Sequence, residues 1–261
     1  MLSAAEAVEL SLLEFFRHFA RARAAGRVAE LDGVSVAAAG IEFHMFNAAF
    51  FATPVTDAGA DLDRRIEEAQ SRLGAGDARW AFWAGAGKFA AVPEARLTAA
   101  FRRRGLYPAF HHPGMACESL APPRKPLPAL EFRRVQDRAG RAEFARLNCH
   151  AFHIPFEWCL ELYDCEPLWT ERFTGYIGCL QGQAVCGAAT LCAADAVGVY
   201  AVATMPGHER KGYGESVMRH AVACAQRESG FSRSVLQATR TGIPLYQRMG
   251  YEPVTHFVVY T

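Results

Sequence analysis

The sequence carries almost no net charge: its 28 lysines and arginines are balanced by 27 aspartates and glutamates, for a formal charge of +1. Proteins that bind nucleic acids usually have a basic excess on at least one domain, because phosphate neutralisation supplies much of their affinity. Only two short basic clusters occur, Arg102-Arg103-Arg104 and Arg124-Lys125. Such runs are typical of a solvated helix face or a linker. We therefore expect no nucleic-acid partner.

Long apolar runs are also missing. No uncharged apolar stretch approaches the roughly 20 residues needed to span a bilayer. Charged residues such as Glu6, Glu9 and Glu14 interrupt the N-terminal segment, which is unlike a targeting signal. These features predict a soluble protein with no membrane partner.

Paired cysteine motifs are absent as well. None of the eight cysteines forms a CxxC pair, although seven lie in the second half of the chain. The spacing of Cys149, His150, His153, Cys159 and Cys165 matches no standard zinc pattern. Disulfide frameworks belong mainly to small secreted domains. We expect a reduced, cytoplasmic protein without a bound metal.

What is present is enough sequence for two packed domains. The chain has 261 residues, of which 51% are hydrophobic and 21% charged, as in globular proteins. A proline-rich segment, with Pro122, Pro123, Pro126 and Pro128, cannot sustain a helix or a central strand. This predicts domains at 1–120 and 130–261, joined by a linker at 121–129.

Hydrophobic periodicity and turn residues predict a mixed α/β order in both halves. The first half is expected to have helices at 4–24, 61–73 and 94–104 and strands at 28–39, 79–84 and 111–120. The second half is expected to follow the order β-α-α-β-β-β-α-β-α-β: strands at 131–135, 174–180, 184–193, 198–205, 234–238 and 255–260, and helices at 138–152, 156–162, 214–229 and 243–249.

The most informative segment joins the strand at 198–205 to the following helix. An apolar strand leads into Pro206, a short basic loop and two glycines, Gly212 and Gly214. Such a loop directs several backbone N–H groups to one point in front of a helix N-terminus, which is an anion site. Arg210 and Lys211 add positive charge. The segment lacks the third glycine of a dinucleotide fingerprint and the Gly-Lys-Ser/Thr ending of a phosphate loop.

A second segment sharpens the interpretation. Leu245-Tyr246-Gln247-Arg248-Met249-Gly250-Tyr251 follows about 30 residues after the glycine loop. Taken together, the two segments resemble the coenzyme loop and the L-Y-x-x-x-G-[FY] helix of the GCN5-related N-acetyltransferase (GNAT) family. The resemblance covers the second half and implies a GNAT-like mixed sheet flanked by helices. It departs at Glu209, where the family usually has Arg or Gln.

The resemblance implies acetyl-CoA as co-substrate and assigns roles to individual residues. The backbone of Val202, Ala203 and Thr204 would pair with the pantetheine arm, and Thr239 stands where relatives often use Asn to orient it. The pyrophosphate would be held by the amides of Glu209, Arg210, Lys211, Gly212, Tyr213 and Gly214. Tyr246 would protonate the departing thiolate, unless it is simply a packed aromatic.

The expected activity is transfer of an acetyl group to the primary amine of a small molecule or an amino acid by direct attack. The alternative is a non-catalytic acyl-CoA-binding sensor or scaffold protein. The sequence does not identify the general base. The candidates lie in the segment that borders the acceptor site in the family: His150, His153, Glu157, Asp164 and Glu166.

A weak internal repeat links the two halves. Phe101-Arg102-Arg103-Arg104-Gly105-Leu106 echoes Tyr246-Gln247-Arg248-Met249-Gly250-Tyr251, with Phe101 in the place of Tyr246. This predicts a degenerate GNAT-like lobe at 1–120 that covers the acceptor side without catalysing, in a monomer or a homodimer. Its pocket-lining candidates, each of which could also be a core or surface residue, are His44, Asn47, Trp80, Trp83, His111 and His112.

Overall fold

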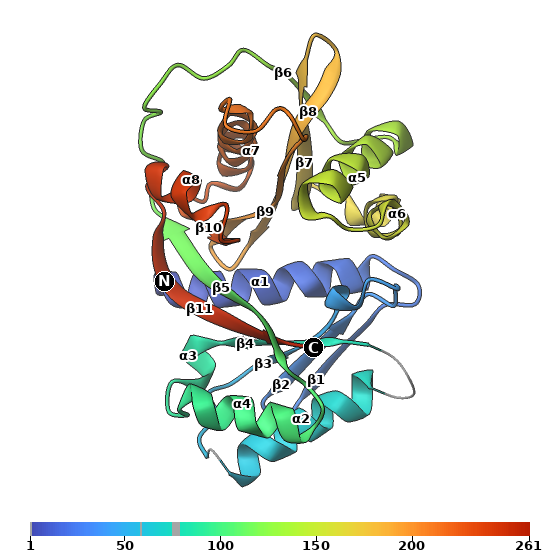
Figure 1. The fold of residues 1–261 in the computed structure, drawn as a ribbon, viewed down its shortest axis with the longest axis vertical. Helices are drawn as coiled ribbons and strands as arrows, with labels where there is room; N and C mark the ends of the chain where they lie inside the picture. The colour runs from blue at the N-terminus through green and yellow to red at the C-terminus, as the bar shows by residue number, and fades with distance from the viewer. Residues whose placement is uncertain (1, 58, 75–78) are drawn as a thin grey trace.

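A computed structural model describes residues 2–57, 59–74 and 79–261 (Figure 1). Across these residues a single mixed sheet of eleven strands runs in the order β1-β2-β3-β4-β11-β5-β10-β9-β8-β7-β6. Helices cover both faces, so the predicted mixed α/β fold is confirmed. The two halves of the chain occupy opposite ends of the molecule, with helix α1 between them.

The N-terminal half begins with α1 (Ala4–Arg21), whose Ser3 and Glu6 form a reciprocal capping box. The expected single strand at 28–39 is instead a hairpin of two strands that turns at Gly33, and the third strand was not predicted. The remaining elements are β1 (Arg27–Leu31), β2 (Val34–Ala38), η1 (His44–Phe46), β3 (Asn47–Phe51), α2 (Ala60–Leu73), β4 (Ala81–Gly85), α3 (Ala86–Phe89), α4 (Glu94–Arg103) and β5 (Pro108–Cys117).

The C-terminal half follows the predicted order of strands and helices, with a short η2 added. Helix α7 covers one face of its strands and α5 and α6 the other (Figure 1). Its elements are β6 (Glu131–Arg134), α5 (Arg138–Phe152), α6 (Phe156–Tyr163), η2 (Glu166–Leu168), β7 (Phe173–Leu180), β8 (Gln183–Ala193), β9 (Ala196–Thr204), α7 (Tyr213–Ser229), β10 (Ser234–Gln237), α8 (Ile243–Arg248) and β11 (Glu252–Tyr260).

The two halves exchange their last strands. β11, at the end of the chain, lies between β4 and β5, while β5 lies between β11 and β10. All three contacts, β4 with β11, β11 with β5 and β5 with β10, are antiparallel. The proline-rich segment therefore joins halves that share one continuous sheet.

The β11–β5 pair lies near the middle of the sheet, with four strands on one side and five on the other, and the internal repeat appears in three dimensions. Each of these strands follows a helix, α4 or α8, through the same turn. Gly105 and Gly250 both adopt positive φ, of 77° and 96°. The next amide donates to the carbonyl of Phe101 in one half and of Tyr246 in the other, at 3.1 and 3.0 Å.

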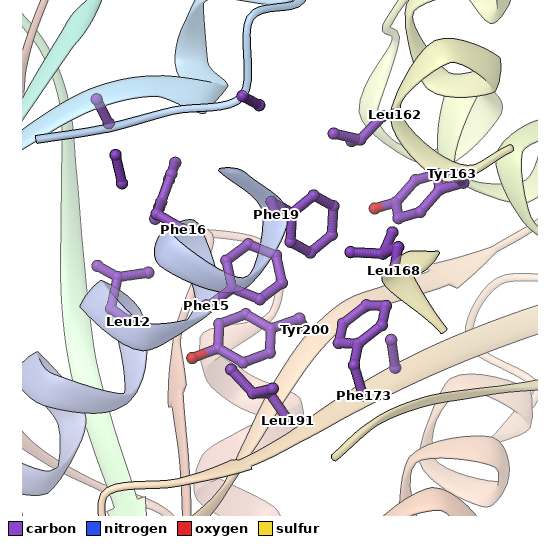
Figure 2. Close-up of a cluster of buried hydrophobic side chains, with 14 of the residues drawn as sticks. Leu12, Phe15, Phe16, Phe19, Leu162, Tyr163, Leu168, Phe173, Leu191 and Tyr200 are labelled. Atoms are coloured by element: carbon purple, nitrogen blue, oxygen red, sulfur yellow. The ribbon is translucent and has the colours of Figure 1, made fainter. Parts of the chain in front are cut away.

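Helix α1 packs across the boundary and contacts strands of both halves. Gly198 in β9 permits this, because a Cβ at that position would lie 2.4 Å from Oγ of Ser11. Phe15 stacks on Tyr200 at 3.9 Å between ring centroids. Figure 2 shows the phenylalanines of α1 surrounded by side chains from α6, β7 and β9. The aromatic face of α1 thus becomes part of the interior of the C-terminal half.

Candidate active site

The central feature of the C-terminal half is a split between two parallel strands. β9 stays paired with β8 as far as Thr204, but it pairs with β10 only at Val197 and Gly198. Just beyond this point Ala201 adopts a φ of 53°, at a register shift that marks a β-bulge. Residues 202–204 therefore have one edge without a partner strand, where an extended ligand can add its own hydrogen bonds.

The loop after β9 ends at the N-terminus of α7. Gly212 is the N-cap residue, with a φ of 85° that favours glycine. A Cβ on Gly214 would lie 3.0 Å from Oγ1 of Thr204, so the helix start packs closely against the end of β9. Within the described chain, the backbone N–H groups of residues 210–215 donate to no other protein group. The first turn of α7 is thus open to an anion.

Glu209, which departs from the family pattern, turns back onto the loop. Its carboxylate accepts a hydrogen bond from the Gly207 amide at 2.7 Å, and Lys211 Nζ donates to the Gly207 carbonyl at 2.7 Å. Arg210 is exposed and has a left-handed φ of 61°. The acidic side chain is therefore directed to the start of the loop, while the amides after it remain available.

Tyr246 lies on α8, opposite the split. A Cβ on Gly242 would lie 2.6 Å from its ring, so the phenol packs closely on that backbone. Burial raises the pKa of Tyr246 to about 12, which keeps the hydroxyl protonated at neutral pH. Its ring also packs edge-on against Tyr251, whose hydroxyl is 2.7 Å from Ser234 Oγ. The position of Tyr246 is therefore well defined.

A cavity of about 260 Å³ lies where the split meets the N-terminal half. Val202, Thr239 and Tyr246, three of the predicted site residues, line it. So do Phe15 and Phe16 of α1, and Figure 2 shows Phe15 against Tyr200. A separate open depression of about 440 Å³ borders Met205, Pro206 and His208 at the start of the loop.

None of the expected general-base candidates lines this cavity. Asp164 forms ion pairs with Arg138 and Arg141, at 3.2 and 3.0 Å, which lower its pKa and make it a poor proton acceptor. The remaining candidates are exposed: His150, His153, Glu157 and Glu166.

Two of the six expected liners from the N-terminal half do reach the cavity, Trp83 and His112. The other four, His44, Asn47, Trp80 and His111, do not line it. Asn47 instead bonds to the backbone of Gly40 and Ile41. The sequence analysis did not predict that phenylalanines of α1 and η1 line the cavity, because their spacing is equally typical of a core face.

Among its described residues, the N-terminal half shows no matching split. β3 and β4 remain paired through Phe50 and Trp83. Arg65 of α2 is buried and donates to the carbonyls of Gly33 and Thr53, at 3.1 and 2.8 Å. These contacts close the space next to β3, where the other half opens its groove.

Among the residues that the structure describes, no group of three or more His, Cys, Asp or Glu could hold a metal ion. All eight cysteines are free thiols. No described helix has the length and apolar character needed to cross a membrane.

The comparisons with known proteins agree with this geometry. Residues 171–253 match the acetyltransferase (GNAT) domain model. A GCN5-related N-acetyltransferase from Kribbella flavida has a TM-score of 0.73 at 18% identity, covering 100% of this chain and 95% of that chain. Another, from Sphaerobacter thermophilus, has a TM-score of 0.55 at 15% identity, covering 89% and 81%. No curated protein sequence matches the chain.

A GCN5-related N-acetyltransferase-like protein from Streptococcus suis spans nearly the same length, with a TM-score of 0.54, 12% identity and 99% of each chain covered. The chain shares its mixed α/β fold with these structures. Within its C-terminal half, residues 171–253 form the part that matches an acetyltransferase (GNAT) domain.

Proposed function

We propose that the chain is an acetyl-CoA-dependent N-acetyltransferase that acts on the primary amine of a small molecule. The observation that carries this proposal is that the unpaired edge of β9 and Tyr246 border one cavity. The free amides of residues 210–215 lie at the end of the same strand, where the pyrophosphate of a coenzyme with its arm along β9 would reach.

In the proposed reaction the amine nitrogen attacks the thioester carbonyl. A backbone N–H of the free β9 edge stabilises the oxyanion. The C–S bond then breaks, and the Tyr246 hydroxyl gives its proton to the leaving thiolate. A phenol with a pKa of about 12 carries its proton at neutral pH, so the proton is present when the thiolate leaves. No covalent enzyme intermediate is required.

The first experiment is calorimetric titration of the protein with acetyl-CoA. Gly212→Val is expected to abolish or strongly weaken binding, because it strains the N-cap of α7 at a φ of 85°. The matched control is Gly230→Val, which places the same strain at the other end of this helix, at a φ of 76°. Equal losses in both variants, or no binding by the unaltered protein, would contradict the proposed coenzyme site.

The second experiment separates an enzyme from a non-catalytic acyl-CoA-binding protein, an alternative kept open by the acidic Glu209. Tyr246→Phe is expected to lower kcat by about 100-fold or more while coenzyme binding is retained. Tyr251→Phe is the control, because this neighbouring tyrosine is buried in the core and bonds to Ser234. Coenzyme binding with no turnover of any amine would favour the sensor or scaffold.

A further inference from the structure

The cavity beside Tyr246 has an unusually apolar wall. Its aromatic lining comes from both halves of the chain, including Phe15 and Phe16 of α1, Phe43 and Phe46 around η1, and Trp83 of β4. Flat aromatic faces at this density fit a ligand with an apolar or aromatic body.

Charged side chains are missing from the same wall. The described residues that line the cavity include no aspartate, glutamate, lysine or arginine. An ammonium ion or a carboxylate buried there would have no ionic partner, and an unpaired buried charge is strongly disfavoured. The cavity therefore favours a neutral amine over its protonated form, and a body without a carboxylate.

Of the described side chains on the wall, His112 is the one suited to take the proton. It lies on β5, the strand that the N-terminal half inserts beside β10. Its Nδ1 is 3.2 Å from the carbonyl oxygen of Ala238, where β10 ends next to Thr239. A carbonyl only accepts hydrogen bonds, so Nδ1 of the neutral ring carries the hydrogen and Nε2 keeps its lone pair.

The surroundings of His112 hold this ring in place and uncharged. It stacks between Trp83 and Phe110, at 5.7 and 5.8 Å between centroids. Burial, and to a lesser extent the neighbouring His111, lower its pKa, so the ring is neutral at pH 7. The other titratable groups on the cavity wall are all held neutral by burial: Cys159, Tyr163, Tyr200 and Tyr246.

We propose that the cavity is the acceptor site for an apolar primary amine without a carboxylate, and that Nε2 of His112 accepts the proton this amine must lose before attack. The inference rests on the proposed acetyltransferase function and deepens it. The ammonium form gives one proton to His112, which releases it to solvent. After attack, the bound nitrogen gives up its second proton, which replaces the one that Tyr246 gave to sulfur.

The substrate half of the proposal is tested with matched amines. 2-Phenylethylamine and L-phenylalanine share a ring and a primary amine but differ in the carboxylate, while 1,5-diaminopentane carries a second positive charge. We expect kcat/KM for 2-phenylethylamine to exceed that of the other two by at least about 100-fold, since each of them buries an unpaired charge. Comparable or better turnover of phenylalanine or the diamine would overturn the inference while leaving the acetyltransferase function intact.

The histidine half is tested with His112→Gln, whose amide can still donate to Ala238, and with His111→Gln as the exposed neighbour. At pH 7 the first variant is expected to lose about 100-fold in kcat/KM with acetyl-CoA affinity unchanged, and the second to resemble the unaltered protein. The deficit should shrink as the pH rises toward the pKa of the free amine, about 10, because the amine then arrives deprotonated.

A purely structural role of His112 predicts the same deficit at every pH, and that result would overturn its assignment as the base. Coenzyme binding without acetylation of any of the three amines would overturn the inference, whereas the acetyltransferase function would fall only if no other amine were acetylated either. Loss of coenzyme binding in the unaltered protein would be a failure of the proposed function itself, and the inference would fall with it.

Discussion

At the scale of single residues, Glu209 is the clearest departure from the family's coenzyme-loop pattern. Its carboxylate accepts a hydrogen bond from the Gly207 amide and brings a negative charge next to the proposed pyrophosphate site. Glu209→Gln keeps a hydrogen-bond acceptor and removes the charge. We expect the Kd for acetyl-CoA to fall by several-fold, equivalent to about 1 kcal/mol of binding free energy. The gain in affinity should be smaller at high salt, which screens the charge.

The measurement is calorimetry at low and high ionic strength. Glu228→Gln makes the same change in net charge at the far end of α7 and serves as the control. An equal gain in the two variants would mean that Glu209 acts only through the overall charge of the protein.

Partly buried histidines predict how the free energy of unfolding depends on pH. Burial lowers the pKa of His18, whose Nε2 lies 2.7 Å from the Leu168 carbonyl oxygen. The unfolded chain, with a histidine pKa near 6.5, then binds protons more readily than the folded protein. Stability is therefore lost as the pH falls below about 6.5, by up to about 1.4 kcal/mol per pH unit for this group.

The test is the melting temperature of the unaltered protein and His18→Gln between pH 8 and 5. The stability of the variant should depend less on acid pH, because His18 is gone. Some dependence should remain, because three other histidines also have a lowered pKa: His44, His112 and His220. Parallel curves for the two proteins would show that His18 does not contribute.

Sequence reasoning could propose those site residues that lie together in the chain. The glycine loop and Tyr246 belong to local motifs, so the sequence alone was enough to propose roles for them. The sequence named His112 only as one of six candidate cavity-lining residues. Its contacts with Trp83 and Ala238 distinguish it from the others, and these residues are distant from it in sequence. The expected base candidates were chosen from the family's acceptor region, and no local pattern could show that they face away from the cavity.

At the scale of elements, α1 depends on the missing side chain at Gly198. Gly198→Ala places a methyl group 2.4 Å from Ser11 Oγ and 2.6 Å from the Tyr200 ring. We expect a loss of about 1–3 kcal/mol in the free energy of unfolding, since the helix or the ring must shift. Urea denaturation measures this loss.

A double-mutant cycle with Ser11→Ala provides the control. Removing the hydroxyl relieves part of the clash, so the two substitutions together should cost less than the sum of their separate effects. Additive losses would show that Ser11 and the methyl group do not compete for the same space.

Element prediction was accurate where a single segment carried its own signals. α1 has its capping box and a continuous apolar face, and it ends close to the expected position. The hairpin of β1 and β2 was predicted as one strand although Asp32-Gly33 is a hairpin turn signal, with Gly33 at a φ of 79°. β3 was not predicted, because its five residues do not alternate between apolar and polar side chains. Both faces of this strand lie near the core.

At the scale of the whole molecule, the exchanged strands predict cooperative unfolding. β11 completes the sheet of the N-terminal half and β5 that of the C-terminal half. Neither half can lose its structure without exposing a strand edge of the other, so a single transition is expected despite the proline-rich linker.

The four tryptophans report on both halves, Trp80 and Trp83 on one and Trp158 and Trp169 on the other. In one variant Trp80 and Trp83 are replaced by phenylalanine, and in the other Trp158 and Trp169 are. In each variant, the urea midpoint measured by the fluorescence of the remaining tryptophans should equal the midpoint measured by far-UV circular dichroism. A separate earlier transition for either pair would show that the halves unfold independently.

The exchange also constrains how the chain can fold as it is synthesised. β5 emerges from the ribosome long before its neighbours β10 and β11, which follow it by more than about 100 residues. At about 5–20 residues per second, that strand waits roughly ten seconds or more with both edges bare. The charged residues around it, rather than its partners, must protect it from aggregation during that interval. Nascent chains that stall after residue 120 are therefore expected to be clients of chaperones, and the native sheet can close only after β11 has emerged.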